Sequence, residues 1–187
     1  MALVIVSHPL PKWVKPQLAR LVDEAPNGRD WLHEVKYGGY RIHARMESGR
    51  VKLLTRTGLD WSHRYKTTVG AFAKLPVKSA YIDGELCALD THGVSSFSRL
   101  QAAMDQGSTH ELVFVAFDLL YLDGTSTAAL PLLERKARLK KVLPRPPARP
   151  DVQRPRRGRR SALPQASLQD GSRRGHIEAH RSGLCPR

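Results

Sequence analysis

The sequence predicts an α+β fold whose strands pair into antiparallel sheets. Segments that alternate apolar and polar residues outnumber segments with helical spacing, a tight turn joins two of them, and the two kinds follow one another in mixed order. A chain of 187 residues is long enough to bury the core of one domain. We expect that domain at residues 11–143 and a tail at residues 144–187.

Three strands are expected first. Trp31–Val35 alternates between apolar and polar residues and lies just before a pair of glycines. Tyr40–Met46 places Tyr, Ile, Ala and Met on one face, and Val51–Thr55 continues after a short turn at Ser48 and Gly49. The last two segments therefore predict a hairpin.

A helix, a strand and a second helix follow. Tyr65–Leu75 has its apolar residues at helical spacing and stops before a proline. Ala80–Leu89 is expected to be a strand. Ser96–Met104 predicts a short helix with Ser95 or Ser96 as its cap, because a serine oxygen can accept hydrogen bonds from the first turn.

One more strand and one more helix complete the domain. Leu112–Leu120 is an apolar run that only Asp118 interrupts, which is typical of a buried strand. Leu132–Val142 predicts a basic helix. Strands thus outnumber helices, as the α+β class requires.

The charge balance favours a partner that is a polyanion. The chain has 31 Lys and Arg against 17 Asp and Glu, a formal net charge of +14. No apolar run is long enough to predict a membrane-spanning helix, and Met1–Val6 does not make a convincing signal peptide. Two cysteines support neither a disulfide framework nor a zinc site. We expect a cytoplasmic protein with no membrane partner.

The tail differs in composition from the rest of the chain. It contains eleven arginines, seven prolines, no lysine and no aromatic residue, so we expect it to be disordered. The run at residues 156–160 is consistent with a basic arm that binds phosphates. The alternative is that the tail was translated out of frame from GC-rich DNA, and we hypothesise a frameshift near residues 144–152.

The candidate chemistry centres on Lys36, which lies between the end of a strand and the glycines 38 and 39. Glycines let a bulky ligand approach the backbone closely, and a lysine so placed can act as a nucleophile. Taken alone, this spacing is more often that of a surface lysine on a loop. Further segments add an arginine at a strand end and acids or an aromatic within apolar strands: residues 54–58, 81–86 and 115–124.

Together and in this order, these segments resemble the nucleotidyltransferase motifs of ATP-dependent DNA ligases, above all the bacterial ligase D type used in end joining. The resemblance runs from about Pro11 to Leu143. It implies a two-sheet antiparallel, ATP-grasp-like adenylation fold, here incomplete at its C-terminus. It also implies nick sealing in DNA repair, end joining and recombination, with nicked or broken double-stranded DNA and end-joining proteins as partners.

The resemblance also implies a role for each candidate residue. Lys36 would attack ATP and carry a lysyl-AMP intermediate, with Mg²⁺ or Mn²⁺ neutralising phosphate charge. The other implied contacts are to the adenine, the ribose or phosphates, and the metal ion: Glu34 and Phe117 for the adenine, Arg41 and Arg56 for ribose or phosphate oxygens, and Glu85 for the ribose hydroxyls or the metal.

The match departs from the family at two places. The family has Lys-x-Asp-Gly where this chain has Lys36-Tyr37-Gly38-Gly39, so an acid beside the nucleophile is missing. After Leu143 the family continues with Glu-Gly-x-x-x-Lys, which is absent in the frame given. Codons permitted for residues 171–186 can encode that motif when read one base later, which is the basis of the frameshift hypothesis. We therefore expect an impaired fragment of a ligase.

Two other functions remain open from the sequence. One is a related nucleotidyltransferase, either an RNA ligase or an mRNA-capping guanylyltransferase. The other is a non-catalytic basic module that binds DNA, for which the net charge is the support. Nucleotide preference separates the capping enzyme from a ligase, and binding that depends on salt but not on ATP would favour the module.

Overall fold

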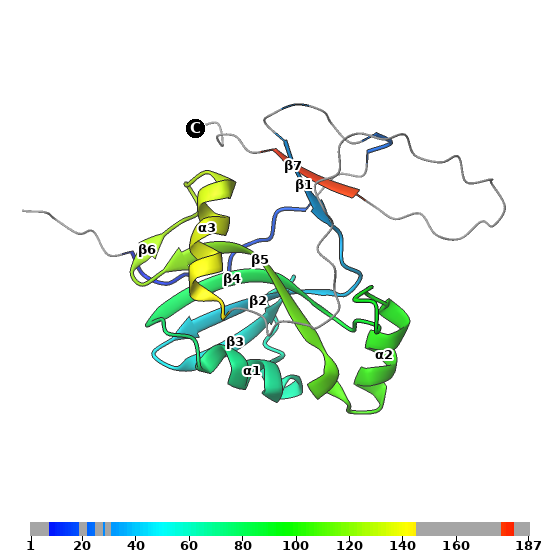
Figure 1. Ribbon diagram of the computed structural model, residues 1–187. Coiled ribbons are helices and arrows are strands. Elements are labelled where there is room, and N and C mark those ends of the chain that lie inside the picture. Colours follow the sequence, from blue (N-terminus) through cyan, green and yellow to red (C-terminus); the bar gives the residue numbers. More distant parts are fainter. Residues whose placement is uncertain (1–7, 19–21, 25–27, 29–30, 145–176, 182–187) are drawn as a thin grey trace, which may run out of the picture.

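The computed structural model describes residues 8–18, 22–24, 28, 31–144 and 177–181 (Figure 1). Its elements are, in chain order, β1 (Trp31–Val35), β2 (Tyr40–Glu47), β3 (Arg50–Thr55), a 3₁₀ turn η1 (Ser62–Arg64), α1 (Lys66–Ala73), β4 (Ser79–Cys87), α2 (Phe97–Asp105), a 3₁₀ turn η2 (Thr109–Glu111), β5 (Val113–Leu122), β6 (Thr125–Ser126), α3 (Leu132–Val142) and β7 (Ile177–Arg181). Every strand pair is antiparallel, so the predicted α+β class is confirmed.

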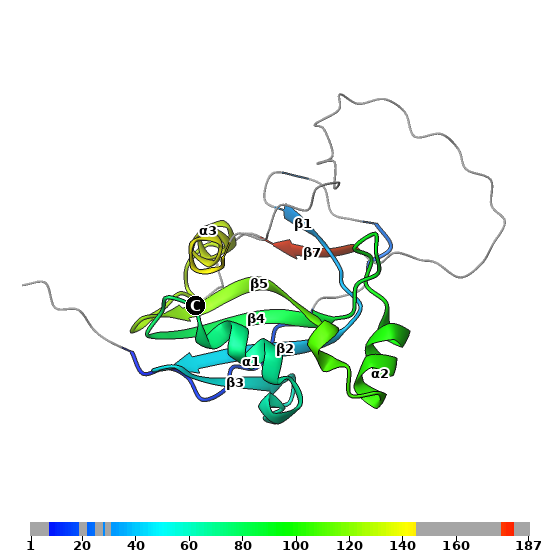
Figure 2. The same cartoon turned by 60° about the horizontal axis from the view of Figure 1, so that its bottom comes forward.

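The strands form two sheets. The larger has the order β3-β2-β4-β5-β6, and the smaller pairs β1 with β7. In Figures 1 and 2, α1 and α2 lie on one side of the larger sheet, and α3 and the β1–β7 pair lie on the other. Within the described part of the chain, no helix has the length and apolar character that crossing a membrane requires.

Each predicted element is present, with ends that differ by a few residues. The hairpin turn at Ser48 and Gly49 has positive φ at both residues, as two-residue turns between twisted strands require. Ser96 caps α2 by accepting a hydrogen bond from the Arg99 N–H. The strands β6 and β7 are additions that the sequence pattern did not predict.

The expectation of a disordered tail falls mostly outside the described residues. Residues 145–176 and 182–187 are not among them. The five residues in between form β7, which runs antiparallel to β1 from Trp31↔Arg181 to Val35↔Ile177. Disorder, the basic arm and the frameshift therefore stay predictions for this tail.

One apolar core joins the larger sheet to all three helices. Alternate residues of β2 and β4 enter it, as the two-residue period of a strand requires. The helices contribute Phe72 from α1, Leu100 from α2 and Leu139 from α3, all of which are buried. Packing against the sheet thus fixes α3 at the side where the candidate residues lie.

The opposite face of β2 and β4 carries a buried polar cluster. Arg41 grips the Asp83 carboxylate with two hydrogen bonds, from Nε to Oδ1 at 2.9 Å and from Nη2 to Oδ2 at 2.7 Å. His43 Nε2 lies 3.2 Å from Asp83 Oδ1 without the alignment of a hydrogen bond. His43 Nδ1 contacts the Tyr81 hydroxyl at 2.8 Å, and that hydroxyl accepts a hydrogen bond from the Val14 N–H. The cluster therefore links the N-terminal segment to the middle of the sheet.

Burial and charge shift the acidities in this cluster in opposite directions. Burial raises the pKa of Tyr81 to about 12. Burial by itself would also raise the pKa of Asp83, but its contacts with His43 and Arg41 outweigh that effect and hold the pKa below the ordinary value of 3.8. Asp83 therefore stays ionised and paired at neutral pH.

A Gly84→Ala substitution should destabilise the fold. A Cβ at this position would lie 2.3 Å from the Phe114 ring and 2.7 Å from the Val115 carbonyl oxygen, so the ring and β5 would have to shift. We expect the free energy of unfolding, measured by urea denaturation, to fall by about 1–3 kcal/mol.

The matched control is Gly70→Ala in α1, where a Cβ would meet nothing within 4 Å. Alanine favours a helix interior over glycine by about 0.5–1 kcal/mol, so this variant should be more stable than the unchanged chain. Equal effects of the two substitutions would contradict the steric argument.

An Asp83→Asn substitution should reduce the pH dependence of stability in acid. Because the pKa of Asp83 is lower in the folded chain than 3.8, its contribution is complete above that pH and is lost as the pH falls through the folded value. Urea denaturation over a pH series should therefore show a shallower acid loss for the variant. At neutral pH the variant should be less stable by roughly 3 kcal/mol, because a buried pair has lost one charge.

Asp105→Asn serves as the control, since this residue is exposed at the end of α2. It should change the free energy of unfolding at neutral pH by less than about 0.5 kcal/mol. An Asp83→Asn variant with the acid profile of the unchanged chain would show that the cluster does not act as described.

Candidate functional site

A cavity of about 1130 Å³ lies among β1, β2, β4, β5 and α3, and its wall includes the turn after β3. All six residues that the sequence singled out line it: Glu34, Lys36, Arg41, Arg56, Glu85 and Phe117. They come from separate segments of the chain, and the outermost two, Glu34 and Phe117, are 83 positions apart in the sequence.

Lys36 begins the loop that connects the two sheets. It is exposed and directly follows β1, while β2 starts four residues later. The loop is held at Gly38, whose N–H donates a hydrogen bond of 2.8 Å to Ser95 Oγ. The arrangement presents the lysine side chain to the cavity from a fixed strand end.

The two glycines of this loop have different constraints. A Cβ at Gly39 would lie 2.2 Å from the Leu86 carbonyl oxygen, so only glycine allows β2 to start this close to β4. A Cβ at Gly38 would have its nearest contact at 3.7 Å, with Ser95 Oγ, which is an ordinary contact. A side chain is therefore sterically acceptable at Gly38 and excluded at Gly39.

Arg41 is a cation of the cavity wall that two hydrogen bonds hold in place. The two hydrogen bonds to Asp83 fix its guanidinium, whose Cζ lies 4.9 Å from the centroid of the Phe117 ring. Such a cation–π contact adds attraction between the two side chains. Glu85 stands directly across from Arg41 in the pairing of β2 with β4. The pairing of β2 with β4 thus places Arg41 beside Glu85, and the cation–π contact places Arg41 beside Phe117.

A β-bulge sets the position of Phe117. Asp83 pairs with Asp118 and Gly84 pairs with Ala116, so Phe117 is the extra residue on β5. A bulge breaks the strict alternation of side chains and redirects the extra residue. Phe117 therefore lines the cavity together with its neighbours Val115 and Ala116 instead of alternating with them.

Arg56 reaches the cavity from the turn that ends β3. The Gly58 N–H donates a hydrogen bond of 2.9 Å to the Thr55 carbonyl oxygen, and Gly58 has a φ of +88°. Arg56 is exposed on this turn. It adds a second guanidinium group to the residues that line the cavity, which also include Arg41.

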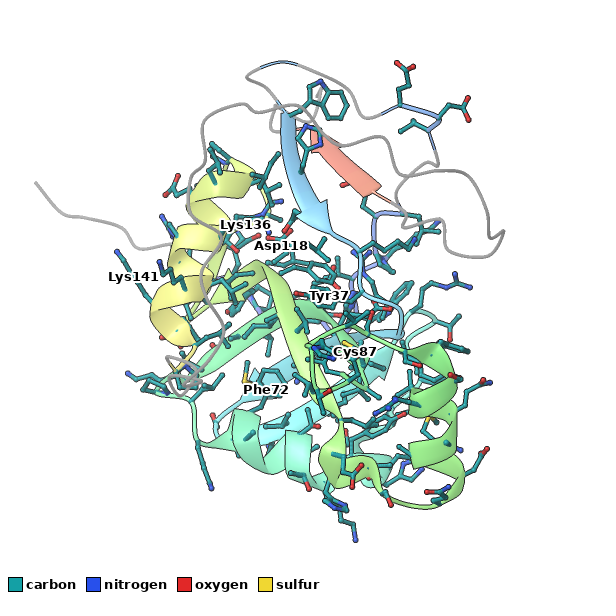
Figure 3. All side chains as sticks on the ribbon, turned by 45° about the vertical axis from the view of Figure 1, so that its right-hand side comes forward. Tyr37, Phe72, Cys87, Asp118, Lys136 and Lys141 are labelled. Carbon is teal, nitrogen blue, oxygen red and sulfur yellow. The ribbon has the colours of Figure 1, made fainter. Side chains whose placement is uncertain are left out.

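Sequence reasoning missed Lys136, which belongs to α3. Its Nζ donates hydrogen bonds of 2.5 Å to Glu34 Oε1 and 2.7 Å to the Phe117 carbonyl oxygen. In Figure 3, Lys136 points from α3 toward β1, whereas Lys141 points away from the cavity. Its spacing in the sequence could have indicated an inward side chain. Lys136 follows Leu132 by four residues and precedes Leu139 by three, so it lies on the same face of the helix as these buried leucines.

The described residues contain no group of three or more His, Cys, Asp or Glu that could hold a metal ion. The carboxylates of the cavity wall are Glu34, which is paired with Lys136, and Glu85. Mg²⁺ commonly keeps several waters and binds through one or two carboxylates together with substrate phosphates. Carboxylate oxygens such as those of Glu85 are thus donor groups that a magnesium ion accepts.

A sequence profile described as the ATP dependent DNA ligase domain matches residues 14–168, which extends past the expected boundary at Leu143. The chain is 42% identical over 135 residues to the multifunctional non-homologous end joining protein LigD of Pseudomonas aeruginosa. The match covers 72% of this chain and 16% of that relative. A DNA ligase-like protein LigB from the SPbeta prophage of Bacillus subtilis is 29% identical over 125 residues, covering 66% of this chain and 45% of that protein.

Solved structures agree with the sequence matches. The ligase domain of LigD from M. tuberculosis has a TM-score of 0.51 and 32% identity, over 59% of this chain and 36% of that chain. A mycobacterial DNA ligase D complexed with ATP and MES has a TM-score of 0.51 and 31% identity, over 63% of this chain and 40% of that chain. These matches confirm the nucleotidyltransferase fold that the sequence motifs predict. The chain belongs to the family of ATP-dependent DNA ligase domains, of the LigD type.

Proposed function

We propose that this chain carries out the adenylation step of DNA ligation, in which Lys36 becomes a lysyl-AMP. The observation that carries the proposal is the convergence of Lys36, two arginines, two glutamates and Phe117 on one cavity. The match spans only 16% of the length of the Pseudomonas relative. Complete DNA ligation, beyond the adenylation step, is therefore also a proposal for this chain. A mycobacterial relative of known structure is complexed with ATP, which supports ATP as the substrate.

The proposed chemistry uses the amine of Lys36 as the nucleophile. After losing a proton, Nζ attacks the α-phosphorus of ATP, a P–N bond forms, and the P–O bond to the leaving pyrophosphate breaks. The AMP is then transferred to a 5′-phosphate at a DNA nick, and a 3′-hydroxyl displaces it to seal the strand. Nicked or broken double-stranded DNA is therefore the proposed partner, and end-joining proteins are proposed partners of the longer protein.

The cavity wall offers a suitable group to each part of ATP. Phe117 would stack on the adenine, and Glu34 would accept a hydrogen bond from its amino group. Arg41, held by Asp83, and the exposed Arg56 suit ribose and phosphate oxygens, because a guanidinium fork matches oxyanions. Glu85 would hold the ribose hydroxyls or a Mg²⁺ or Mn²⁺ ion, which when bound supplies charge neutralisation at the phosphates.

A purified 187-residue chain should become labelled by ATP carrying a radioactive α-phosphate in the presence of Mg²⁺. A Lys36→Ala variant should lose the label to background, because the attacking amine is gone. Lys74→Ala is the matched control: this lysine is exposed at the end of α1 and does not line the cavity. Label that persists without Lys36, or no label on a folded unchanged chain, would contradict the proposal.

The same assay tests the related functions. GTP should not label the chain, and a chain labelled by GTP in preference to ATP would favour a capping guanylyltransferase. When the adenylated chain is mixed with nicked DNA or with nicked RNA, the nucleic acid that becomes sealed distinguishes a DNA ligase from an RNA ligase. Salt-dependent DNA binding without any labelling would favour the non-catalytic basic module.

A Gly38→Asp substitution should increase self-adenylation by roughly two- to fivefold, the effect expected when a glycine loop loses backbone freedom and gains an acceptor near the nucleophile. The space at Gly38 accommodates a Cβ, as its 3.7 Å contact with Ser95 Oγ shows. The initial rate of labelling is the measurement.

Gly38→Ala separates the two contributions, because it restricts the backbone without adding a carboxylate. An increase for Asp alone would assign the effect to the acid, and equal increases would assign it to the loop. If neither variant gains activity, Gly38 does not limit self-adenylation.

A further inference from the structure

Lys136 joins the two residues proposed to contact adenine. Its ammonium donates one hydrogen bond to the Glu34 carboxylate in β1 and another to the Phe117 carbonyl in β5. These strands belong to different sheets, so Lys136 bridges the sheets across the cavity. The side chains of Lys136 and Glu34 are 22% and 26% exposed, which places the pair at the cavity wall and largely out of solvent.

The helix that carries Lys136 is anchored on both sides of this residue. The preceding residue, Arg135, grips the Asp118 carboxylate through Nε at 2.8 Å and Nη2 at 3.0 Å, and also donates a hydrogen bond to the Leu130 carbonyl. Leu139, one turn later, is buried in the core. The ammonium is therefore held at a defined point, and through it the Glu34 carboxylate is held as well.

A carboxylate held in this position can distinguish adenine from guanine by the group at position 6 of the purine. At position 6, adenine carries an amino group that donates hydrogen bonds, whereas guanine carries a carbonyl oxygen that accepts them. A carboxylate is an acceptor only. A Glu34 carboxylate with one oxygen bound to Lys136 can turn the other oxygen toward an amino donor, and that same oxygen would repel the guanine carbonyl.

We propose that Lys136 is a positioning residue that sets nucleotide specificity: by fixing Glu34 relative to Phe117, it makes the cavity favour ATP over GTP. The inference rests on the proposed function, because it assumes that the base lies between Glu34 and Phe117. Lys136 itself acts through Glu34 and takes no part in the bond-forming step.

The test compares ATP and GTP binding to the full 187-residue chain by calorimetry, together with the rate constant and KM of self-adenylation. Lys136→Met keeps the apolar stem and removes the ammonium. We expect ATP to bind about tenfold more weakly, as for loss of a partner from a partly buried polar pair, while GTP binding changes little. The ATP-to-GTP preference should fall by about the same factor, with the loss in KM and a largely unchanged rate constant at saturation.

Three further variants make the result specific. Lys141→Met removes the same charge from the outer side of the same helix and should leave both affinities unchanged (Figure 3). Lys136→Arg retains a donor with positive charge and should recover part of the ATP preference. Glu34→Gln should by itself lower the ATP-to-GTP preference. Adding Lys136→Met to it should lower the preference little further, because the two residues act as one unit.

The outcomes separate the specificity role from a structural one. Thermal unfolding identifies variants that have lost the fold, and Lys136→Gln replaces Lys136→Met if the latter does not fold. An unchanged ATP-to-GTP preference in a folded variant would overturn the inference, and so would an equal loss of both nucleotides. Failure of the unchanged chain to bind either nucleotide would instead overturn the proposed function on which the inference rests.

Discussion

The buried carboxylate of Asp83 fixes the geometry on which the cavity depends. With its side chain only 5% exposed, it holds Arg41 by two hydrogen bonds and lies 3.2 Å from His43, which in turn contacts Tyr81. Leaving any member of such a buried charged group without its partner is costly, so the cluster has one arrangement. Arg41 therefore presents its guanidinium beside Phe117 in one orientation, which the Asp83 carboxylate sets.

Close approach of the backbone is the second constraint on the site. Gly39 allows the start of β2 to lie against Leu86, and Gly84 allows the Phe114 ring to cross β4. The bulge opposite Gly84 then supplies the extra residue that places Phe117 in the cavity wall. Gly39 thus allows close approach of β2 to β4, and Gly84 makes room for the Phe114 ring of β5, which explains a glycine at each of these two positions.

Local patterns predicted the helices α1 to α3 and the longer strands β1 to β5, and the structure places the six candidate residues around one cavity. The sequence did not reveal contacts that depend on the third dimension. In the sequence, His43 and Tyr81 fit the alternating pattern of their strands and show no sign of a contact. The contact exists only because β2 and β4 are neighbours. Lys136 sits in a helix rich in lysine and arginine, where charge alone does not distinguish the inward side chain from outward ones such as Lys141. The short β6 and the distant β7 lack a periodic pattern of useful length.

The net charge of +14 describes the whole chain, but the cavity wall has an ordered distribution of charge. Its cations are Lys36, Arg41, Arg56, Lys136 and Lys140, and its carboxylates are Glu34 and Glu85. An excess of positive charge favours a polyphosphate, because low-dielectric walls concentrate the field inside a cleft. The two carboxylates would be unfavourable beside phosphates without a cation near them. Glu34 has the Lys136 ammonium, and Glu85 stands across from Arg41. The cavity therefore combines an excess of positive charge with two carboxylates that can accept hydrogen bonds, a combination that fits the proposed ATP substrate and that a uniformly basic surface could not provide.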